Sequence, residues 1–269
     1  MNKNKGENKL NYLIMTMVGI YLALPLVTLF LYSLSVEWSS ILPEGLTFRY
    51  YQEIFQNTAF LTSILRSILI SVIPVVVTTI LILLVMYVVI LYHPRMDKYL
   101  QILCTIPYAI QGVILAIGVL SLYADSPRPL SNRTLMLSAT YCIVILPYLY
   151  QGIRNSLFSV NAPRLVEAAR ILGASRLYAY FGIIVPNILS GITVSALLGS
   201  AIVFGDFVVI KIIGANYFET SQMYLYRALS QSGQKTSAIV VILFTVTLIL
   251  SASVLFIGKK GTILEEKEQ

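Results

Sequence analysis

Six apolar stretches dominate this sequence and constrain what it can fold into. They cover residues 12–33, 65–92, 100–123, 134–153, 187–210 and 236–257. A helix needs roughly 20 apolar residues to cross the hydrocarbon core of a bilayer, and every stretch reaches that length. Short segments of alternating polar and apolar residues, which are typical of outer-membrane barrels, do not occur in this pattern. The sequence therefore predicts an all-α, polytopic membrane bundle with six transmembrane helices.

The first apolar stretch follows Lys3, Lys5 and Lys9, as the core of a cleaved signal peptide would. Its apolar run lasts about 22 residues, however, which is longer than the usual 7 to 15 of a signal peptide. No small-residue cleavage site closes the run. We therefore expect a retained transmembrane helix.

The placement of basic residues predicts the orientation, because lysine and arginine near span ends stay preferentially in the cytoplasm. Of the 19 such residues, twelve fall on the side of the amino terminus and seven on the other. Both termini and the loop 154–186 are therefore expected in the cytoplasm, with residues 1–11 as an N-terminal segment, 12–258 as the transmembrane domain and 259–269 as a tail. The net charge of +7 is spread over these span ends, so no nucleic-acid partner is expected.

Few residues in the chain suit catalysis or metal binding. Cys104 and Cys142 both fall inside apolar stretches, where packing is the expected role of two isolated thiols. His93 is the single histidine and lies beside Pro94 at a predicted helix end, which is typical of an interfacial residue. No acid motif accompanies it, so we expect neither a catalytic site nor a metal site in this chain.

Helix breakers and small residues recur along the predicted spans. Prolines lie inside the first four spans and at the start of the fifth, at Pro25, Pro74, Pro107, Pro147 and Pro186. Such residues kink a helix and are tolerated in lipid where neighbouring helices satisfy the freed carbonyls. On the fifth span, Gly191, Ser195 and Gly199 share one helix face, which predicts close packing against another helix of the same protein.

The loop 154–186 is too long and too polar to be a plain turn. Pro163 suits a first helical turn with Asn161 as its cap, and Leu165, Val166, Ala169 and Leu172 then recur at helical spacing. Gly173 is expected to end this helix. Ser175 is expected to cap a second short helix over residues 176–184, which Pro186 would end. An amphipathic helix lying on the lipid surface is the alternative interpretation.

This loop resembles the cytoplasmic signature of permeases from binding-protein-dependent ABC importers. The signature reads Glu-Ala-Ala, three residues, Gly, nine residues, then Ile-x-Leu-Pro. The chain matches it at Glu167, Ala168, Ala169, Gly173, Ile183 and Pro186, with Val185 in place of the usual leucine. The resemblance implies that the first short helix docks into a groove on a separate ATPase subunit.

By the same resemblance, Glu167 supplies a polar contact to the ATPase, Ala168 and Ala169 permit close approach, Leu172 belongs to the docking helix and Gly173 makes the turn. The sequence holds no phosphate-binding loop of the form G-x-x-x-x-G-K-[ST]. Residues 258–262 contain the same residue types, but their spacing differs from that pattern. No cofactor is expected in this chain, and ATP and Mg belong to the ATPase. The expected partners are two ABC ATPase subunits, a second permease that is identical or related, an extracytoplasmic solute-binding protein and the lipid bilayer of the bacterial inner membrane.

The candidate residues of a translocation path are Asp206, Arg66 and Gly205, because ionisable groups within the membrane are expensive and usually functional. An interfacial position for the two charged side chains is the alternative. The segment 204–207 and the segment from Trp38 to Tyr51, with Leu42-Pro43-Glu44-Gly45, are similar to the importer branch that serves polyamines, ferric iron and organophosphonates such as 2-aminoethylphosphonate.

Two other classes of protein are weighed against the importer permease. An ion-coupled secondary transporter would ordinarily show several intramembrane acids or histidines, and often two repeated halves, neither of which the sequence displays. A non-transporting subunit that recruits a cytoplasmic partner would dock an ATPase without moving a solute.

Overall fold

The computed structural model describes residues 4–38, 44–214 and 217–267. Helices make up nearly all of this part of the chain, which confirms the predicted all-α fold. The chain separates into two compact units, one of residues 1–61 and 224–245, the other of residues 62–223 and 246–269. Lys3, Leu42 and Pro43, which entered the sequence analysis, lie outside the described residues.

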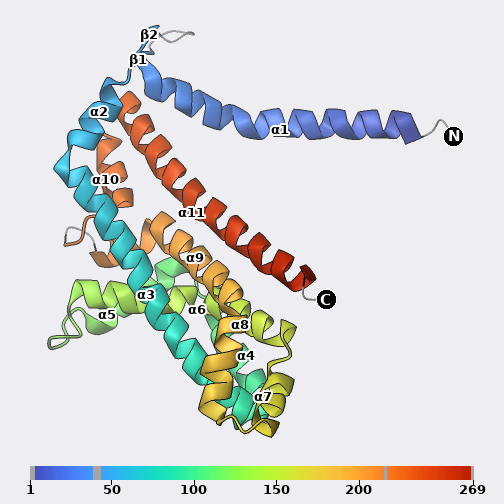
Figure 1. The fold of residues 1–269 in the computed structure, drawn as a ribbon. Coiled ribbons are helices and arrows are strands. Elements are labelled where there is room, and N and C mark those ends of the chain that lie inside the picture. Colours follow the sequence, from blue (N-terminus) through green and yellow to red (C-terminus); the bar gives the residue numbers. More distant parts are fainter. Residues whose placement is uncertain (1–3, 39–43, 215–216, 268–269) are drawn as a thin grey trace. The chain divides into compact units, whose positions relative to one another are not determined.

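The elements follow one another as labelled in Figure 1. The α-helices are α1 (Asn4–Leu34), α2 (Arg49–Gln56), α3 (Thr58–Leu91), α4 (Asp97–Ala109), α5 (Gly112–Tyr123), α6 (Arg133–Ser159), α7 (Ala162–Ile171), α8 (Val185–Asn187), α9 (Leu189–Gly205), α10 (Ser221–Ala228) and α11 (Gly233–Lys267). A 3-10 turn, η1 (Pro94–Met96), and two π-helical segments, η2 (Tyr178–Ile184) and η3 (Ile210–Gly214), join them. The strands β1 (Ser35–Glu37) and β2 (Glu44–Leu46) complete the chain.

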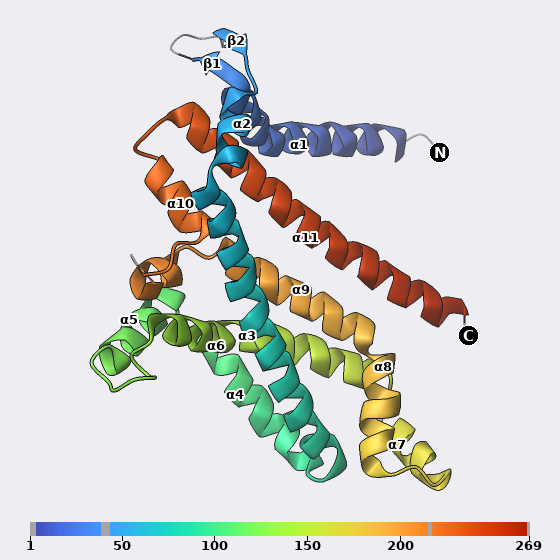
Figure 2. The ribbon, with the colours of Figure 1, turned by 60° about the vertical axis from the view of Figure 1, so that its left-hand side comes forward.

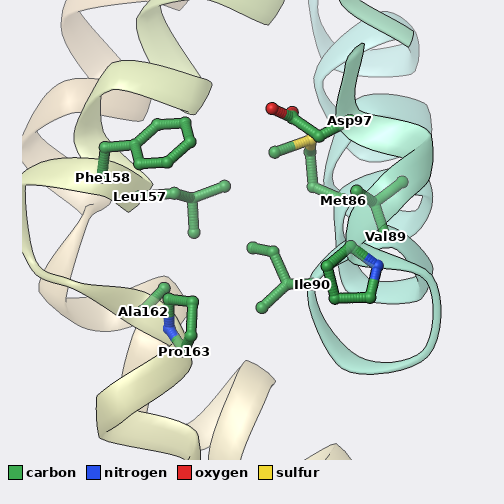
Figure 3. A pocket seen from close by; sticks show the side chains of 9 residues that line it. Met86, Val89, Ile90, Asp97, Leu157, Phe158, Ala162 and Pro163 are labelled. Atoms are coloured by element: carbon green, nitrogen blue, oxygen red, sulfur yellow. The ribbon is translucent and has the colours of Figure 1, made fainter. Parts of the chain in front are cut away.

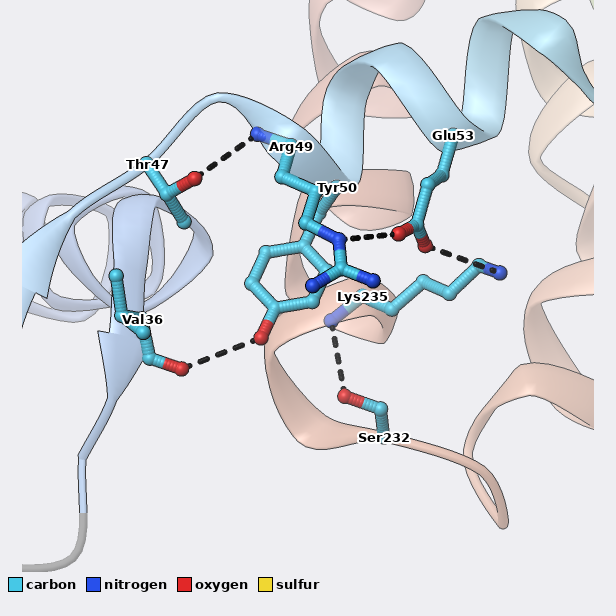
Figure 4. Close-up of polar contacts among 7 residues, drawn as sticks. All are labelled: Val36, Thr47, Arg49, Tyr50, Glu53, Ser232 and Lys235. Atoms are coloured by element: carbon cyan, nitrogen blue, oxygen red, sulfur yellow. Dashed lines mark hydrogen bonds and ion pairs between the residues drawn. The ribbon is translucent and has the colours of Figure 1, made fainter.

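In the first unit, β1 and β2 form a small antiparallel hairpin in which Ser35 pairs with Leu46. The hairpin is tied to α2 by the hydroxyl of Tyr50, which donates to the carbonyl of Val36 at 3.2 Å (Figure 4). On α2 the carboxylate of Glu53 accepts from Arg49 Nε at 2.8 Å. The sequence patterns did not predict this hairpin.

The same Glu53 carboxylate also lies 3.9 Å from Lys235 Nζ at the start of α11. An ion pair therefore joins the two separate stretches of sequence that make up the first unit. The pair is partly exposed, so it contributes little stability by itself.

In the second unit, α3 and α6 confirm two of the predicted spans as long apolar helices. The span predicted over residues 100–123 is not one continuous helix, because α4 and α5 meet at a bend of 95°. Ile110 and Gln111 at the bend are both extended, and the N–H of Ile110 turns back to the carbonyl of Pro107 at 3.2 Å. Pro107 itself has no N–H to continue the helical ladder. The helix α4 continues two residues past this proline and ends at Ala109.

The fifth predicted span is shorter than residues 187–210, because α9 begins at Leu189 and ends at Gly205. By length and composition, the described residues hold three helices able to cross a membrane, and up to five if each bent pair makes one span. The last predicted span corresponds to α11, whose apolar part, Gly233–Ile249, is shorter than these helices. The count of six spans and the orientation of the termini stay predictions.

The core of the second unit is the crossing of α6 and α9, which lie side by side in both views (Figure 1 and Figure 2). A Cβ added to Gly152 would lie 2.8 Å from Ser195 Cβ, and one added to Gly191 would lie 2.8 Å from Ser156 Cβ. Each serine hydroxyl donates within its own helix, to the carbonyl four residues earlier, at 2.8 Å. The predicted packing face of the fifth span is confirmed, and two glycine–serine pairs bring the backbones together.

Candidate functional site

The helix α7 carries the Glu-Ala-Ala residues and begins at a sharp corner after α6. Asn161 at this corner is left-handed, with φ of 49° and ψ of 53°. Asn161 is the N-cap residue of α7, as predicted, although its side chain makes no capping bond. Its backbone carbonyl accepts from the N–H groups of Arg164 at 3.0 Å and Leu165 at 3.3 Å. Asparagine tolerates the left-handed region better than most residues, which explains its use here. Pro163 occupies the first turn of α7, as predicted.

The predicted coupling residues do not all lie on the same face of α7. Val166 and Ala169 are buried against the rest of the second unit, with 5% and 6% of their surface exposed. Glu167 and Ala168 are exposed. Leu172, which the resemblance assigns to the docking helix, is 88% exposed. The close approach predicted for both alanines is therefore available to Ala168, whereas Ala169 packs within the chain.

The end of α7 is a fully formed Schellman motif centred on Gly173, whose φ is +88°. The N–H of Gly173 donates to the carbonyl of Arg170, and the N–H of Ala174 donates to that of Ala169, both at 3.0 Å. This pair of bonds satisfies carbonyls that the helix end would otherwise leave without a partner. The predicted helix-ending role of Gly173 is confirmed.

The motif also sets the position of two large apolar side chains. Ile171 and Leu172, immediately before the glycine, are 87% and 88% exposed. Two adjacent apolar side chains held this far out of the fold form a small surface suited to contact with another protein.

A second helical segment follows from Arg176. Ser175 caps it, as predicted, since its hydroxyl accepts from the N–H of Tyr178 at 3.2 Å. The helix runs through η2 and α8 and ends at Asn187, one residue beyond the predicted stop at Pro186, and the chain bends by 67° before α9.

An aromatic cluster anchors this second segment to α3. The buried Tyr180 donates its hydroxyl to the carbonyl of Leu83 at 2.9 Å. The ring of Tyr87 lies 5.3 Å from that of Tyr180 and 5.7 Å from that of Phe181. The loop 154–186 is thus fixed to the bundle through specific side chains, which favours a stiff unit over a helix resting on lipid.

A second anchor, which the sequence analysis missed, joins α4 to α6. Asp97 accepts two bonds from Arg154, at 2.6 Å from Nη2 and 3.1 Å from Nε. The hydroxyl of Tyr150 donates to the same carboxylate at 3.4 Å, and the Arg154 guanidinium lies 4.5 Å from the ring centre of Phe158. We call Asp97, Arg154 and Tyr150 the α4–α6 clasp. The guanidinium lowers the pKa of the Asp97 carboxyl, which precedes the apolar stretch, below its ordinary value.

Beside the clasp lies a mostly apolar cavity of about 350 Å³ (Figure 3). It separates the hairpin of α3 and α4 from the corner between α6 and α7. Its lining includes Asp97, Met86 and Ile90 on one side and Leu157 and Ala162 on the other. Side chains therefore do not fill the space directly behind the start of α7.

The predicted path residues lie elsewhere in the second unit. Asp206 follows the last residue of α9, and its Oδ2 accepts from the Tyr141 hydroxyl at 2.9 Å and from the N–H of Val209 at 3.0 Å. Gly205 beside it is exposed. The exposed Arg66 has its guanidinium 5.9 Å from the ring centre of Phe218. No ion pair joins Asp206 and Arg66 in the part of the chain that the structure describes.

These contacts give Asp206 a structural task that can be measured. In Asp206→Ala the Tyr141 hydroxyl and the Val209 N–H both lose their acceptor, and unpaired buried groups cost about 1–3 kcal/mol each. We expect the midpoint of thermal unfolding in detergent to fall by about 5 °C or more. Asp206→Asn keeps a carbonyl acceptor and should retain most of the stability. Unchanged unfolding in both variants, with altered solute affinity, would instead assign Asp206 to the solute path.

Comparisons with known proteins agree on one family. Residues 65–260 match the family model described as "Binding-protein-dependent transport system inner membrane component". A Salmonella typhimurium protein, provisionally named the 2-aminoethylphosphonate transport system permease protein PhnV, is 20% identical over 90% of this chain and 91% of its own. A Sinorhizobium fredii protein, y4fN, provisionally named an ABC transporter permease, is 25% identical over 63% of this chain and 31% of its own.

The fold also matches a solved structure. A chain from the crystal structure of a bacterial ABC transporter involved in the import of the acidic polysaccharide alginate superposes with a TM-score of 0.73. The match covers 97% of each chain at 18% sequence identity. At this identity the likeness shows the shared fold.

Proposed function

Because this chain belongs to the family of binding-protein-dependent transport system inner membrane components, we propose that it forms the translocation path for a small polar solute of the organophosphonate type. The chain is a multi-pass membrane permease subunit of an ABC importer, a class that works with ATPase and solute-binding partners. An ion-coupled secondary transporter, the alternative weighed from the sequence, does not belong to this family.

The observation that carries the coupling role is the exposed end of α7. Ile171 and Leu172 are almost fully exposed, Glu167 and Ala168 lie on the outer surface, and the Schellman turn at Gly173 fixes them in place. An apolar pair beside a carboxylate and a small residue suits a groove that is apolar at its base and basic at its rim. We assign this surface, Glu167, Ala168, Ile171 and Leu172, to the contact with the ATPase.

The remaining parts of the assembly follow from this assignment. ATP and Mg bind to the ATPase, and this chain contributes no catalytic residue or cofactor site. Two ATPases act on two permease subunits, identical or related, and an extracytoplasmic protein delivers the solute. Both termini and the loop 154–186 face the cytoplasm of a bacterial cell, as the distribution of basic residues indicates.

The preference for a phosphonate rests on the named Salmonella relative, which spans nearly the whole chain. Polyamines and ferric iron, which the related importer branch serves, are the competing solutes. The chain offers both an acid, Asp206, and a base, Arg66, near the outer ends of its predicted spans. Such a pair suits a zwitterion such as 2-aminoethylphosphonate.

Uptake by whole cells tests the substrate directly. Cells that carry this chain with its cognate partners should accumulate radiolabelled 2-aminoethylphosphonate, and deletion of the gene should reduce uptake to background. An excess of unlabelled 2-aminoethylphosphonate should compete, whereas putrescine and ferric citrate should not. Competition by putrescine or ferric citrate alone would replace the phosphonate with that solute and leave the importer assignment intact.

A further inference from the structure

The α4–α6 clasp joins two segments that are far apart in the sequence and lies near the start of α7, the helix that carries the surface assigned to the ATPase. Asp97 is the first residue of α4, and Arg154 lies in the last turns of α6. From Arg154 the helix α6 continues without interruption to Ser159, and α7 starts at Ala162. A displacement of α7 therefore reaches Arg154 through little more than one turn of continuous helix and one sharp corner.

The geometry of the clasp is that of a rigid connection. Arg154 binds both carboxylate oxygens of Asp97, so the relative orientation of the two groups is fixed as well as their distance. The side chains of Arg154 and Asp97 are 22% and 23% exposed, which shields the pair from much of the solvent. The ring of Phe158 supports the guanidinium from α6 itself.

The cavity beside the clasp makes this connection more important. Where side chains fill an interface, packing alone transmits a displacement. Here about 350 Å³ separates the α3–α4 hairpin from the corner of α6 and α7, and both Asp97 and Ala162 line it. The corner can therefore move relative to the hairpin without immediate steric contact, and the ion pair, at the edge of the cavity, ties α4 to α6 where the two helices pack together.

Beyond the clasp, α4 leads to the broken span. The bend of 95° at Ile110 and Gln111 separates α4 from α5, and α5 packs against η3. A Cβ added to Gly112, the first residue of α5, would lie 3.3 Å from Cγ2 of Val209. The N–H of Val209 is in turn bound by Asp206. A displacement of α4 therefore reaches the segment that holds the candidate path residue Asp206.

We infer that the α4–α6 clasp is a coupling element that transmits displacement of α7 to the broken span α4–α5, with Asp97 and Arg154 as its positioning residues. The inference rests on the proposed docking of an ATPase to α7 and adds the route inside this chain. Arg154→Gln or Asp97→Asn removes the charged connection while leaving the docking surface unchanged. The ATPase should remain bound, but its cycle should no longer move α5.

A distance measurement across the second unit tests the route without requiring a known solute. Spin labels are placed at Arg164→Cys on α7 and Leu122→Cys on α5, in a background with Cys104→Ser and Cys142→Ala. The tagged complex is purified with its ATPase and placed in nanodiscs, and the distance between labels is measured with and without ATP and vanadate. We expect the ATP-dependent distance change to fall at least about twofold in Asp97→Asn and in Arg154→Gln. The double variant Asp97→Arg/Arg154→Asp should restore most of it.

Uptake and hydrolysis provide the second measurement. Each single variant should lower 2-aminoethylphosphonate uptake about tenfold, with ATP hydrolysis of the complex changed less than about twofold. Arg154→Lys, which keeps the charge but cannot bind both oxygens, should fall between the wild type and Arg154→Gln. The matched control is Lys98→Gln, which changes one exposed charge beside the clasp without breaking the ion pair, and it should behave as the wild type.

The outcomes separate the two proposals. Normal ATP-dependent distance changes in both single variants, with the ATPase bound, would overturn the clasp as a coupling element and leave the importer function standing. Loss of the change in the charge-swapped variant as well, in a folded complex, would also count against it. If the wild-type chain retained no ATPase on purification, the proposed docking would fail, and the inference would fail with it.

Discussion

Replacing Gly191 with leucine is expected to prevent the second unit from folding. Its Cβ would lie 2.8 Å from Ser156 Cβ and even closer to the hydroxyl, at the point where α6 and α9 approach most closely. The larger side chain would force the two helices apart along their shared face. Overpacking in a well-packed core costs about 1–3 kcal/mol, and a clash this close to backbone should reach about 3 kcal/mol or more. Thermal unfolding and size-exclusion chromatography in detergent measure the loss.

The control for this prediction is Gly118→Leu on α5. No atom lies within 4 Å of a Cβ added at Gly118, and the position is exposed. The same increase in side-chain volume should therefore leave folding unchanged. If Gly191→Leu gave a monodisperse protein with wild-type stability, the close crossing of α6 and α9 would be wrong.

Replacing Gly173 with proline is expected to uncouple ATP hydrolysis from transport while the protein stays inserted. Proline fixes φ near −65°, whereas Gly173 has φ of +88°, and proline cannot make the bond from the Gly173 N–H to Arg170. The Schellman turn would open, and Ile171 and Leu172 would lose their fixed position. Because coupling free energies are commonly worth 5- to 150-fold, we expect solute uptake to fall about tenfold or more.

The matched control is Gly173→Asn, because asparagine adopts the left-handed conformation more readily than other side chains. It should retain most of the uptake, and Gly173→Ala should fall between the two. Amounts of each variant in the membrane fraction show whether insertion is preserved. Wild-type uptake and hydrolysis in Gly173→Pro would contradict the lever role of α7.

Much of the fold follows from hydropathy, because a helix that crosses a bilayer needs roughly 20 apolar residues, and runs of that length can be found directly in the sequence. The long helices α1, α3 and α6 lie where apolar runs predict them. The broken span α4–α5 was not predicted in this way, since residues 100–123 form one long, mainly apolar stretch, and neither Pro107 nor Gln111-Gly112 distinguishes a kink from a break. The difference lies in the extended backbone of Ile110 and Gln111.

The candidate site likewise combines features that the sequence predicted with features that it did not. Ser175 and Gly173 were predicted correctly because caps and left-handed glycines are local features of the chain. Leu172, which was assigned to the docking helix, lies one residue beyond the last residue of α7, Ile171, and is 88% exposed. The clasp left no local signal at all: Asp97 and Arg154 are 57 residues apart, and their pairing exists only in the folded chain.

The serine hydroxyls at the crossing of α6 and α9 bear on how easily an importer of this design changes state. The hydroxyls of Ser156 and Ser195 donate to carbonyls of their own helices. A small rotation of one helix against the other about this contact therefore breaks neither bond. A threonine or asparagine that formed a hydrogen bond from one helix to the other at this contact would restrict that rotation.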